Sequence, residues 1–202
     1  MLISGRGSNF MQIHRMQREG RIAGRIVCVI SSRENAQGLV YAREHGIPTY
    51  VLPAETMKNE SAFASTLLDR LRRHDVQLVV LAGFLKKVPD AVVEAFAGRM
   101  INIHPALLPA FGGKGMYGRR VHEAVLEYGC KVSGATVHIV TQEYDAGPPV
   151  LQKCVPVLED DTPDTLARRV LEVEHELLPR AVDLFARGLV GVRGQRVFIR
   201  QA

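Results

Sequence analysis

The sequence predicts an α/β fold built on a doubly wound, mostly parallel sheet with helices on both faces. Short apolar runs alternate along the chain with segments in which apolar residues recur at helical spacing. The chain has 202 residues, 47% of them hydrophobic, which is enough for one sizeable core. No fixed-period repeat or low-complexity tract divides it. We therefore expect a single domain over residues 1–202.

The short apolar runs are the expected strands of this sheet. Their order in the sheet does not follow from one sequence. Ligands in open sheets of this kind bind beyond the carboxyl ends of the strands, so we expect the functional site at that edge. The runs cover residues 2–3, 25–31, 49–52, 77–82, 100–103, 135–140 and 150–157.

Two helices can be placed from their spacing and their capping residues. Apolar residues recur every four positions from Phe63 and predict a helix over residues 61–73 with one buried stripe. Thr162 followed by Pro163 is typical of an N-cap and a first turn, and predicts the start of a long helix. We expect Pro179 to kink or end that helix, because proline lacks the N–H of the helical hydrogen bond.

The charge of the chain favours small anionic ligands over nucleic acid. The 26 Lys and Arg residues against 21 Asp and Glu residues leave a net charge of +5. The basic residues are scattered, and the aromatic residues, 6% of the chain, do not interleave with them to form a stacking platform. We therefore expect no nucleic-acid partner and interpret the charge as mild attraction for small anions.

The sequence also predicts a cytoplasmic protein without a membrane partner. Its longest apolar runs, such as residues 78–82, are far too short to span a bilayer. The first residues do not resemble a secretion signal. The three cysteines, Cys28, Cys130 and Cys154, have a wide spacing that fits neither a disulfide framework nor a metal or redox pair. We expect them to be buried small hydrophobic residues.

A glycine-containing loop follows the first expected strand and precedes a helical segment. Gly5 and Gly7 let backbone N–H groups turn toward one point, and the N-terminus of the next helix adds positive potential, so the loop suits a phosphate. A plain strand-to-helix turn is the alternative, since Ser8 and Asn9 are ordinary N-cap residues. Phe10 stands where a dinucleotide-binding fingerprint has its third glycine, so a phosphate monoester fits better.

Two polar residues, Asn102 and His104, alternate with isoleucines at the end of a strand. Strand alternation sends both side chains to one face, which places an amide beside an imidazole. Pro105 and Pro109 stiffen the chain that follows. A lone histidine at a strand end is more often structural, and the neighbouring amide favours a functional role here.

Asp145 lies in a turn that can bring a carboxylate to the same edge. Aspartate in such a turn is often only a turn former. If Asp145 meets His104, it raises the pKa of the imidazole and orients the ring, giving a proton donor or oxyanion stabiliser near neutral pH. His138 and His122 lack a comparable context, so we interpret both as structural.

Glu174 lies at the border of the buried stripe of the last long helix. A carboxylate there needs hydrogen-bond donors, because an unpaired buried charge is costly. An ion pair with an arginine and a contact with ribose hydroxyls are the two interpretations, and the residues alone do not separate them.

Five segments taken together resemble the glycinamide ribonucleotide formyltransferases of the folate-dependent formyltransferase family. The similarity runs in order from residue 1 to about residue 188, and the Asn-x-His-Pro-x-Leu-Leu-Pro element is the most specific part of it. The segments are Gly-Arg-Gly-Ser-Asn at 5–9, Leu-Ala-Gly-Phe-Leu-Lys at 81–86, Asn-Ile-His-Pro-Ala-Leu-Leu-Pro at 102–109, Tyr-Asp-Ala-Gly-Pro at 144–148 and Glu-His at 174–175.

This resemblance implies a Rossmann-like fold, 10-formyltetrahydrofolate as co-substrate and no metal. It implies formyl transfer to the amine of glycinamide ribonucleotide, a step of de novo purine biosynthesis, by a monomer or homodimer that binds small molecules alone. The implied catalytic residues are Asn102, His104 and Asp145. The residues implied to bind the substrate phosphate are Gly7, Ser8 and Asn9, and the residue implied to bind the ribose is Glu174. The residues implied to bind the folate are Lys58, Leu85, Lys86, Lys87, Val88, Asn102, Thr141, Gln142, Glu143, Tyr144 and Asp145.

The mechanism expected from the resemblance is direct transfer without a covalent enzyme intermediate. Asn102 and a protonated His104 stabilise the oxyanion, and Asp145 keeps His104 charged. The chain departs from the family in three places. Its first strand is short, Lys58 is only a candidate for a basic residue common in the family, and the glycine-rich segment 111–118 is a candidate mobile lid.

Three other functions are weighed against this one. A formyltetrahydrofolate hydrolase of the same family usually carries an additional N-terminal regulatory domain, for which we expect no room. A methionyl-tRNA formyltransferase needs a C-terminal RNA-binding domain. A non-catalytic module that binds a phosphorylated ligand could keep the Gly-Ser-Asn loop without needing Asn102, His104 and Asp145 together.

Overall fold

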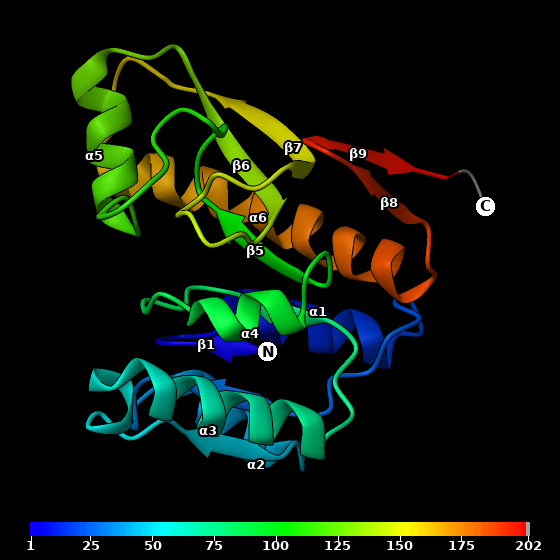
Figure 1. The fold of residues 1–202 in the computed structure, drawn as a ribbon. Coiled ribbons are helices and arrows are strands. Elements are labelled where there is room, and N and C mark those ends of the chain that lie inside the picture. The colour runs from blue at the N-terminus through cyan, green and yellow to red at the C-terminus, as the bar shows by residue number, and fades with distance from the viewer. Residues whose placement is uncertain (201–202) are drawn as a thin grey trace.

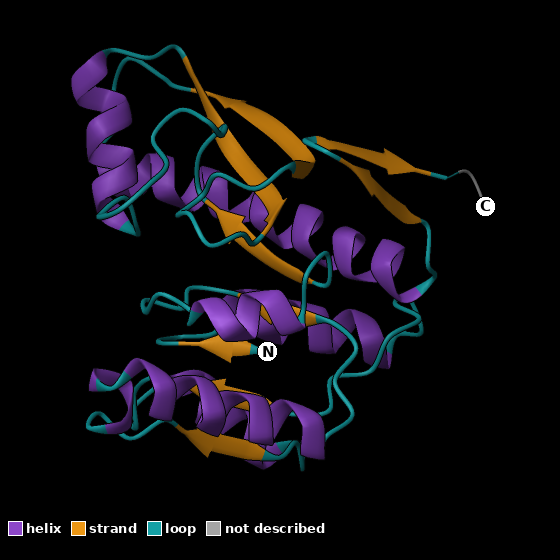
Figure 2. Ribbon diagram, in the orientation of Figure 1, coloured by secondary structure: helices purple, strands orange, loops and turns teal. Residues whose placement is uncertain are grey.

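The computed structural model describes residues 1–200 and confirms the α/β class. Across these residues the main sheet has seven strands in the order β3-β2-β1-β4-β5-β6-β7, and helices cover both of its faces (Figures 1 and 2). All pairs among strands β1 to β5 are parallel. Strand β6 runs antiparallel to β5, and β7 runs antiparallel to β6. The strands are β1 (Leu2–Ile3), β2 (Val29–Ser31), β3 (Thr49–Val51), β4 (Val79–Leu81), β5 (Met100–His104), β6 (Val132–Ile139) and β7 (Pro149–Pro156).

The helices begin where the side chains needed for capping occur. Asn59 accepts a hydrogen bond from the N–H of Ala62 at 2.9 Å and caps α3. Thr162 is the N-cap of α6, as expected from the sequence, and it forms a capping box with Thr165. The helices are α1 (Ser8–Arg18), α2 (Gln37–Glu44), the 3-10 turn η1 (Thr56–Lys58), α3 (Glu60–Arg73), α4 (Asp90–Ala95), α5 (Arg119–Tyr128) and α6 (Pro163–Ala186).

Of the two outcomes expected at Pro179, a kink or the end of the helix, the second is wrong. The helix does not end there but continues to Ala186 (Figure 1). Proline removes the hydrogen bond to the carbonyl of His175. On both sides of it, however, Leu178 and Ala181 are buried in the core against the sheet. Tertiary packing of the apolar face outweighs the missing bond.

Alternation along the strands divides the core between the two faces of the sheet. In β4, Val79 and Leu81 pack in one cluster with Leu67 of α3. Val80, which lies between them, packs in a second cluster with Val170 of α6. A third cluster joins α1 and α2 to the strands at the N-terminal end of the chain.

The same alternation positions the polar side chains of β5. Ile101 and Ile103 join the cluster of α6, so Asn102 and His104 face the opposite side of the sheet. On that side the loops after β4, β5 and β6 enclose a cavity that both side chains line. The shared face of Asn102 and His104 is therefore the face on which a ligand can approach.

Two further features differ from the sequence-based expectations. A separate two-stranded sheet, β8 (Val190–Arg193) with β9 (Arg196–Ile199), follows α6 and was not predicted. Of the cysteines, Cys28 is buried, but Cys130 is half-buried and Cys154 is exposed on the outer strand β7. The buried interpretation holds for Cys28 and was wrong for Cys154. Among residues 1–200 no helix is long and apolar enough to cross a membrane.

Candidate active site

The loop after β1 leads directly into α1 at the carboxyl edge of the sheet. Gly7 is the N-cap of α1 and has a φ of 76°, a left-handed conformation that glycine adopts without strain. A Cβ at this position would also lie 3.0 Å from the Cα of Gly38. The first backbone N–H groups of a helix have no partner within it, so those near Ser8 are available to an anion.

The side chain of Asn9 binds Glu174. Its Nδ2 donates a hydrogen bond to Oε2 of Glu174 at 2.6 Å, which joins α1 to α6. The Oδ1 atom of Asn9 is buried without a partner in the protein. Loss of solvent raises the pKa of Glu174 to about 7, against the hydrogen bond from Asn9, which lowers it. An arginine partner for Glu174, one of the two interpretations from sequence, was wrong.

Ser4 connects the loop after β1 with the loop after β4. Its buried hydroxyl lies 2.6 Å from the hydroxyl of Ser32 and accepts a hydrogen bond from the N–H of Leu85 at 2.9 Å. Leu85 begins the segment that the resemblance assigns to folate. The two proposed ligand sites thus share one structural link, which sequence reasoning did not identify.

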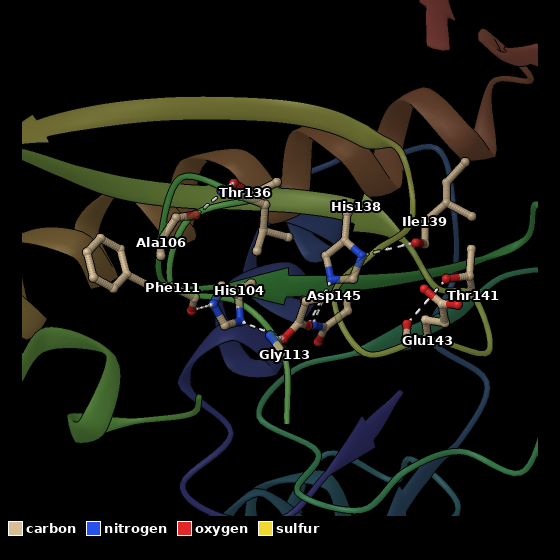
Figure 3. A network of polar contacts seen from close by, with 12 residues as sticks. His104, Ala106, Phe111, Gly113, Thr136, His138, Ile139, Thr141, Glu143 and Asp145 are labelled. Carbon is tan, nitrogen blue, oxygen red and sulfur yellow. Dashed lines mark hydrogen bonds and ion pairs between the residues drawn. The ribbon is translucent and has the colours of Figure 1, made fainter. Parts of the chain in front are cut away.

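His104 and Asp145 lie together at the end of β5 (Figure 3). Asn102 lines the same cavity. Nδ1 of His104 is 3.6 Å from Oδ2 of Asp145, and Nε2 of His104 is 2.8 Å from the backbone oxygen of Phe111. The backbone N–H of Gly113 donates to Oδ2 of Asp145 at 2.9 Å. The glycine-rich segment 111–118 is therefore hydrogen-bonded to both side chains.

The burial of His104 decides its charge, and this corrects the expectation from sequence. Burial lowers the pKa of His104 by more than the neighbouring Asp145 raises it, so the imidazole is neutral in the free protein at pH 7. For Asp145, burial acts to raise the pKa, but hydrogen bonds, with the side chain of His138 first and the backbone N–H of Gly113 as well, help to bring it below its ordinary value. The resting pair is a neutral imidazole beside a carboxylate.

Asp145 reaches His104 by a route that the sequence did not reveal. Because β6 runs antiparallel to β5, its carboxyl end lies beside the amino end of β5, where the N–H of Val140 bonds to the carbonyl of Met100. The turn after β6 then folds back over the sheet. Asp145 has a φ of 53°, and a Cβ on Gly147 would lie 1.8 Å from the oxygen of Ile139. Both backbone features make this sharp return possible.

The stiff segment after His104 is held by side chains as well as by prolines. The hydroxyl of Thr136 donates to the carbonyl of Ala106 at 2.7 Å and accepts from the N–H of Leu108 at 3.0 Å. Gln152 donates to the carbonyl of Leu108 at 2.9 Å. Strands β6 and β7 thereby fix the loop that carries the histidine.

The cavity beside these residues has a volume of about 160 Å³. Nearly all residues that the resemblance assigns to folate line it. Lys58 is not among its lining residues and pairs with Glu55 at 2.7 Å on the surface. The lining includes Leu85, Lys86, Lys87, Val88, Asn102, Thr141, Gln142, Glu143, Tyr144 and Asp145, with Gly113 and Gly115 of the glycine-rich segment.

His138 belongs to the site, although the sequence suggested a structural role. Its Nε2 lies 3.0 Å from Nδ2 of Asn102 and 3.4 Å from Oδ1 of Asp145 (Figure 3 shows His138 with Asp145). The feature that identifies His138 as part of the site is its pairing with Asn102 across β5 and β6. This is a long-range register, so a single sequence does not display it. In residues 1–200 no group of three or more His, Cys, Asp or Glu is arranged to hold a metal ion.

An imidazole, a carboxylate and an amide around one cavity in an α/β fold are groups that can transfer protons and stabilise a developing negative charge. Residues 1–182 match the family model described as formyl transferase. The chain belongs to the formyl transferase family.

Individual relatives agree with this assignment. The chain is 46% identical, over 90% of its length, to phosphoribosylglycinamide formyltransferase, chloroplastic, from Arabidopsis thaliana. It is 38% identical, over 93% of its length, to phosphoribosylglycinamide formyltransferase from Escherichia coli, and it covers 86% of that protein. It spans 63% of the Arabidopsis protein and 59% of its Vigna unguiculata counterpart. The crystal structure of glycinamide ribonucleotide transformylase 1 from Symbiobacterium toebii superposes with a TM-score of 0.93 at 44% identity, covering 99% of this chain and 92% of that one.

Proposed function

We propose that this chain transfers the formyl group of 10-formyltetrahydrofolate to the amine of glycinamide ribonucleotide, a step of purine biosynthesis. The observation that carries the proposal is the contact between His104 and Asp145 in a cavity that Asn102 also lines. Similarity to proteins named phosphoribosylglycinamide formyltransferase supports the same substrate. In this proposal the chain acts in the cytoplasm as a monomer or homodimer, and its own side chains supply the acid–base chemistry.

The phosphate of the substrate binds at the N-terminus of α1. The backbone N–H groups near Gly7 and Ser8, with the helix dipole behind them, attract a phosphate monoester. The side chain of Asn9 acts through Glu174, to which it is hydrogen-bonded. Glu174 then binds the ribose hydroxyls, which replace part of the solvent that its carboxylate has lost.

The formyl carbon is attacked by the substrate amine, and negative charge develops on the formyl oxygen. A new C–N bond forms to the substrate, and the C–N bond to folate breaks. Nδ2 of Asn102 donates to the developing oxyanion, an effect for which a single donor is worth about 3 to 4 kcal/mol. No covalent bond to the enzyme is needed.

His104 carries the proton between the two nitrogens. Because the imidazole starts neutral, it can accept the proton that the attacking amine loses, directly or through water. The carboxylate of Asp145, 3.6 Å away, stabilises the imidazolium that forms. The imidazolium then protonates the departing folate nitrogen, so His104 is charged during the reaction and not before it.

The size of the cavity matches the reacting end of a folate. A volume of about 160 Å³ is below the range typical of sites that enclose whole drug-sized ligands. We propose that it accepts the ring system, while the remainder of the folate lies along the mouth of the cavity near Lys86 and Lys87. Lys86 complements the carboxylates of a folate tail, whereas Lys87 pairs with Asp90 at 2.9 Å.

The proposal is tested with purified protein and 10-formyltetrahydrofolate, in the presence and absence of glycinamide ribonucleotide. Release of tetrahydrofolate that depends on the amine substrate is the expected result. Release without the amine would identify a hydrolase instead. Binding of the phosphorylated ligand without any release would identify a non-catalytic module.

A further inference from the structure

We propose that Ser4 is a positioning residue that couples the two ligand sites, so that a phosphate bound at the loop after β1 favours folate binding in the cavity. The inference rests on the proposed function, which places the two ligands at these sites. It concerns a side chain that the proposed mechanism does not use. Its basis is the hydrogen bonding of one buried hydroxyl between two loops.

Ser4 lies where two neighbouring strands of the sheet separate. Strand β1 lies between β2 and β4, and the N–H of Ala82 donates to the carbonyl of Leu2 at 3.0 Å where β1 and β4 end their pairing. Gly83 has a φ of 69°, which turns the chain after β4 out of the sheet. Two residues further on, the N–H of Leu85 donates to the hydroxyl of Ser4 at 2.9 Å. The side chain of Ser4 thus joins the two chains beyond the end of the strands.

The direction of the bond between Ser4 and Leu85 is fixed by its atoms. A backbone N–H can only donate, so Oγ of Ser4 is the acceptor whichever way its own hydrogen points. The same oxygen lies 2.6 Å from the hydroxyl of Ser32, and either hydroxyl can donate in that contact. Ser4 is 2% exposed and Ser32 is 8% exposed, so the protein rather than solvent holds this hydroxyl in place.

The two ends of this link belong to different ligand sites. Ser4 directly precedes Gly5, whose carbonyl accepts from the N–H of Gly38 at 3.3 Å, and the same loop continues to Gly7 at the start of α1. Leu85 lines the cavity proposed for folate, whereas Ser4 is not among its lining residues. Ser4 therefore acts on a bound folate through Leu85 and not by direct contact.

A link between two loops couples the ligands that the loops bind. A phosphate at the N-terminus of α1 orders the loop after β1, and the hydroxyl of Ser4 then orders the N–H of Leu85 and the chain that follows it. A folate that binds second has less backbone to order, so its binding costs less conformational entropy. By thermodynamic linkage, a bound folate favours the phosphate by the same factor.

The coupling is measured by calorimetry with ligands that bind without reacting. Tetrahydrofolate carries no formyl group and ribose 5-phosphate carries no amine, so the titration reports binding alone. In the wild type, saturating ribose 5-phosphate should lower the Kd of tetrahydrofolate about fivefold, a typical coupling factor. In Ser4→Ala the same addition should change the Kd by less than about 1.5-fold, because Leu85 has lost its acceptor.

Ser32→Ala is the matched control. It removes a comparably buried hydroxyl and the same contact between the two serines, but it leaves the bond from Leu85 to Ser4 in place. This variant should keep a coupling of at least about threefold. If Ser4→Ala fails to fold, Ser4→Cys gives the same test, because a thiol of similar shape is only a weak acceptor. Its coupling should fall below about twofold.

A measurement without ligands reports the link itself. In amide hydrogen exchange of the free protein, the N–H of Leu85 should be protected in the wild type and in Ser32→Ala. It should exchange at least about tenfold faster in Ser4→Ala. A merely structural role for Ser4 would change the exchange of many amides together and would leave the coupling factor of the folded variant unchanged.

The outcomes separate this inference from the proposed function. Equal coupling in the wild type and Ser4→Ala would overturn the positioning role, and so would a wild type that binds both ligands independently. Either result leaves the proposed function intact. A wild type that binds neither ligand would refute the proposed function and the coupling with it.

Discussion

Replacement of Glu174 by glutamine should stabilise the free protein, and the gain should increase with pH. Loss of solvent raises the pKa of Glu174 from 4.5 to about 7. A carboxyl with a raised pKa keeps its full contribution to stability below about pH 4.5 and loses it as the pH rises through 7. The shift corresponds to about 3 kcal/mol. Because the residue is half-buried, remaining contact with water lowers this desolvation cost, and we expect about 2 kcal/mol.

Urea denaturation at pH 5 and pH 8 measures this difference. The free energy of unfolding of Glu174→Gln minus that of the wild type should increase by about 2 kcal/mol between the two pH values, with unchanged m-values. Glu172→Gln, an exposed substitution on the same helix, is the matched control and should change by less than about 0.5 kcal/mol. A difference that is the same at both pH values, or a wild type more stable than Glu174→Gln at pH 8, would refute the reasoning.

Three further predictions concern the catalytic pair, the turn that carries it and the core. His104→Ala and Asp145→Asn should each lower turnover by about 1,000-fold with folate affinity within a few-fold, and the double variant should lose less than the product; near-normal turnover in either would contradict the pairing. Gly147→Ala should lower kcat at least tenfold, measured at saturating substrates, because its Cβ would meet the oxygen of Ile139 at 1.8 Å; unchanged kcat would show that the turn tolerates the shift. Leu67→Ala should cost about 3 kcal/mol in urea denaturation, because the residue is fully buried; a cost below about 1 kcal/mol would contradict its place in the core.

The parts of the fold that depend on local sequence could be predicted from it. Helical spacing from Phe63 identified α3 to within one residue of its start, and Thr162 with Pro163 identified the beginning of α6. Alternation in β5 identified the common face of Asn102 and His104. Each of these features is decided by neighbours a few positions apart, which a single sequence displays.

The parts that depend on distant contacts could not be predicted. The antiparallel direction of β6 and the pairing of Asn102 with His138 are properties of strand order, so His138 was interpreted as structural. The neutral state of His104 follows from burial by loops that lie far apart in the sequence. Pro179 stays within α6 because the core packs around it. In each case tertiary contacts outweigh the local preference.

Transfer of a ¹³C-labelled formyl group tests the proposed reaction and its catalytic residues most directly. Wild-type protein is incubated with 10-[¹³C]formyltetrahydrofolate and glycinamide ribonucleotide, and the product is followed by NMR. We predict that the label appears on the substrate amine, and that Asp145→Asn, shown to be folded by circular dichroism, slows its appearance about 1,000-fold. Label that appears as free formate in the wild type, or that reaches the amine at an undiminished rate in Asp145→Asn, would contradict the proposal.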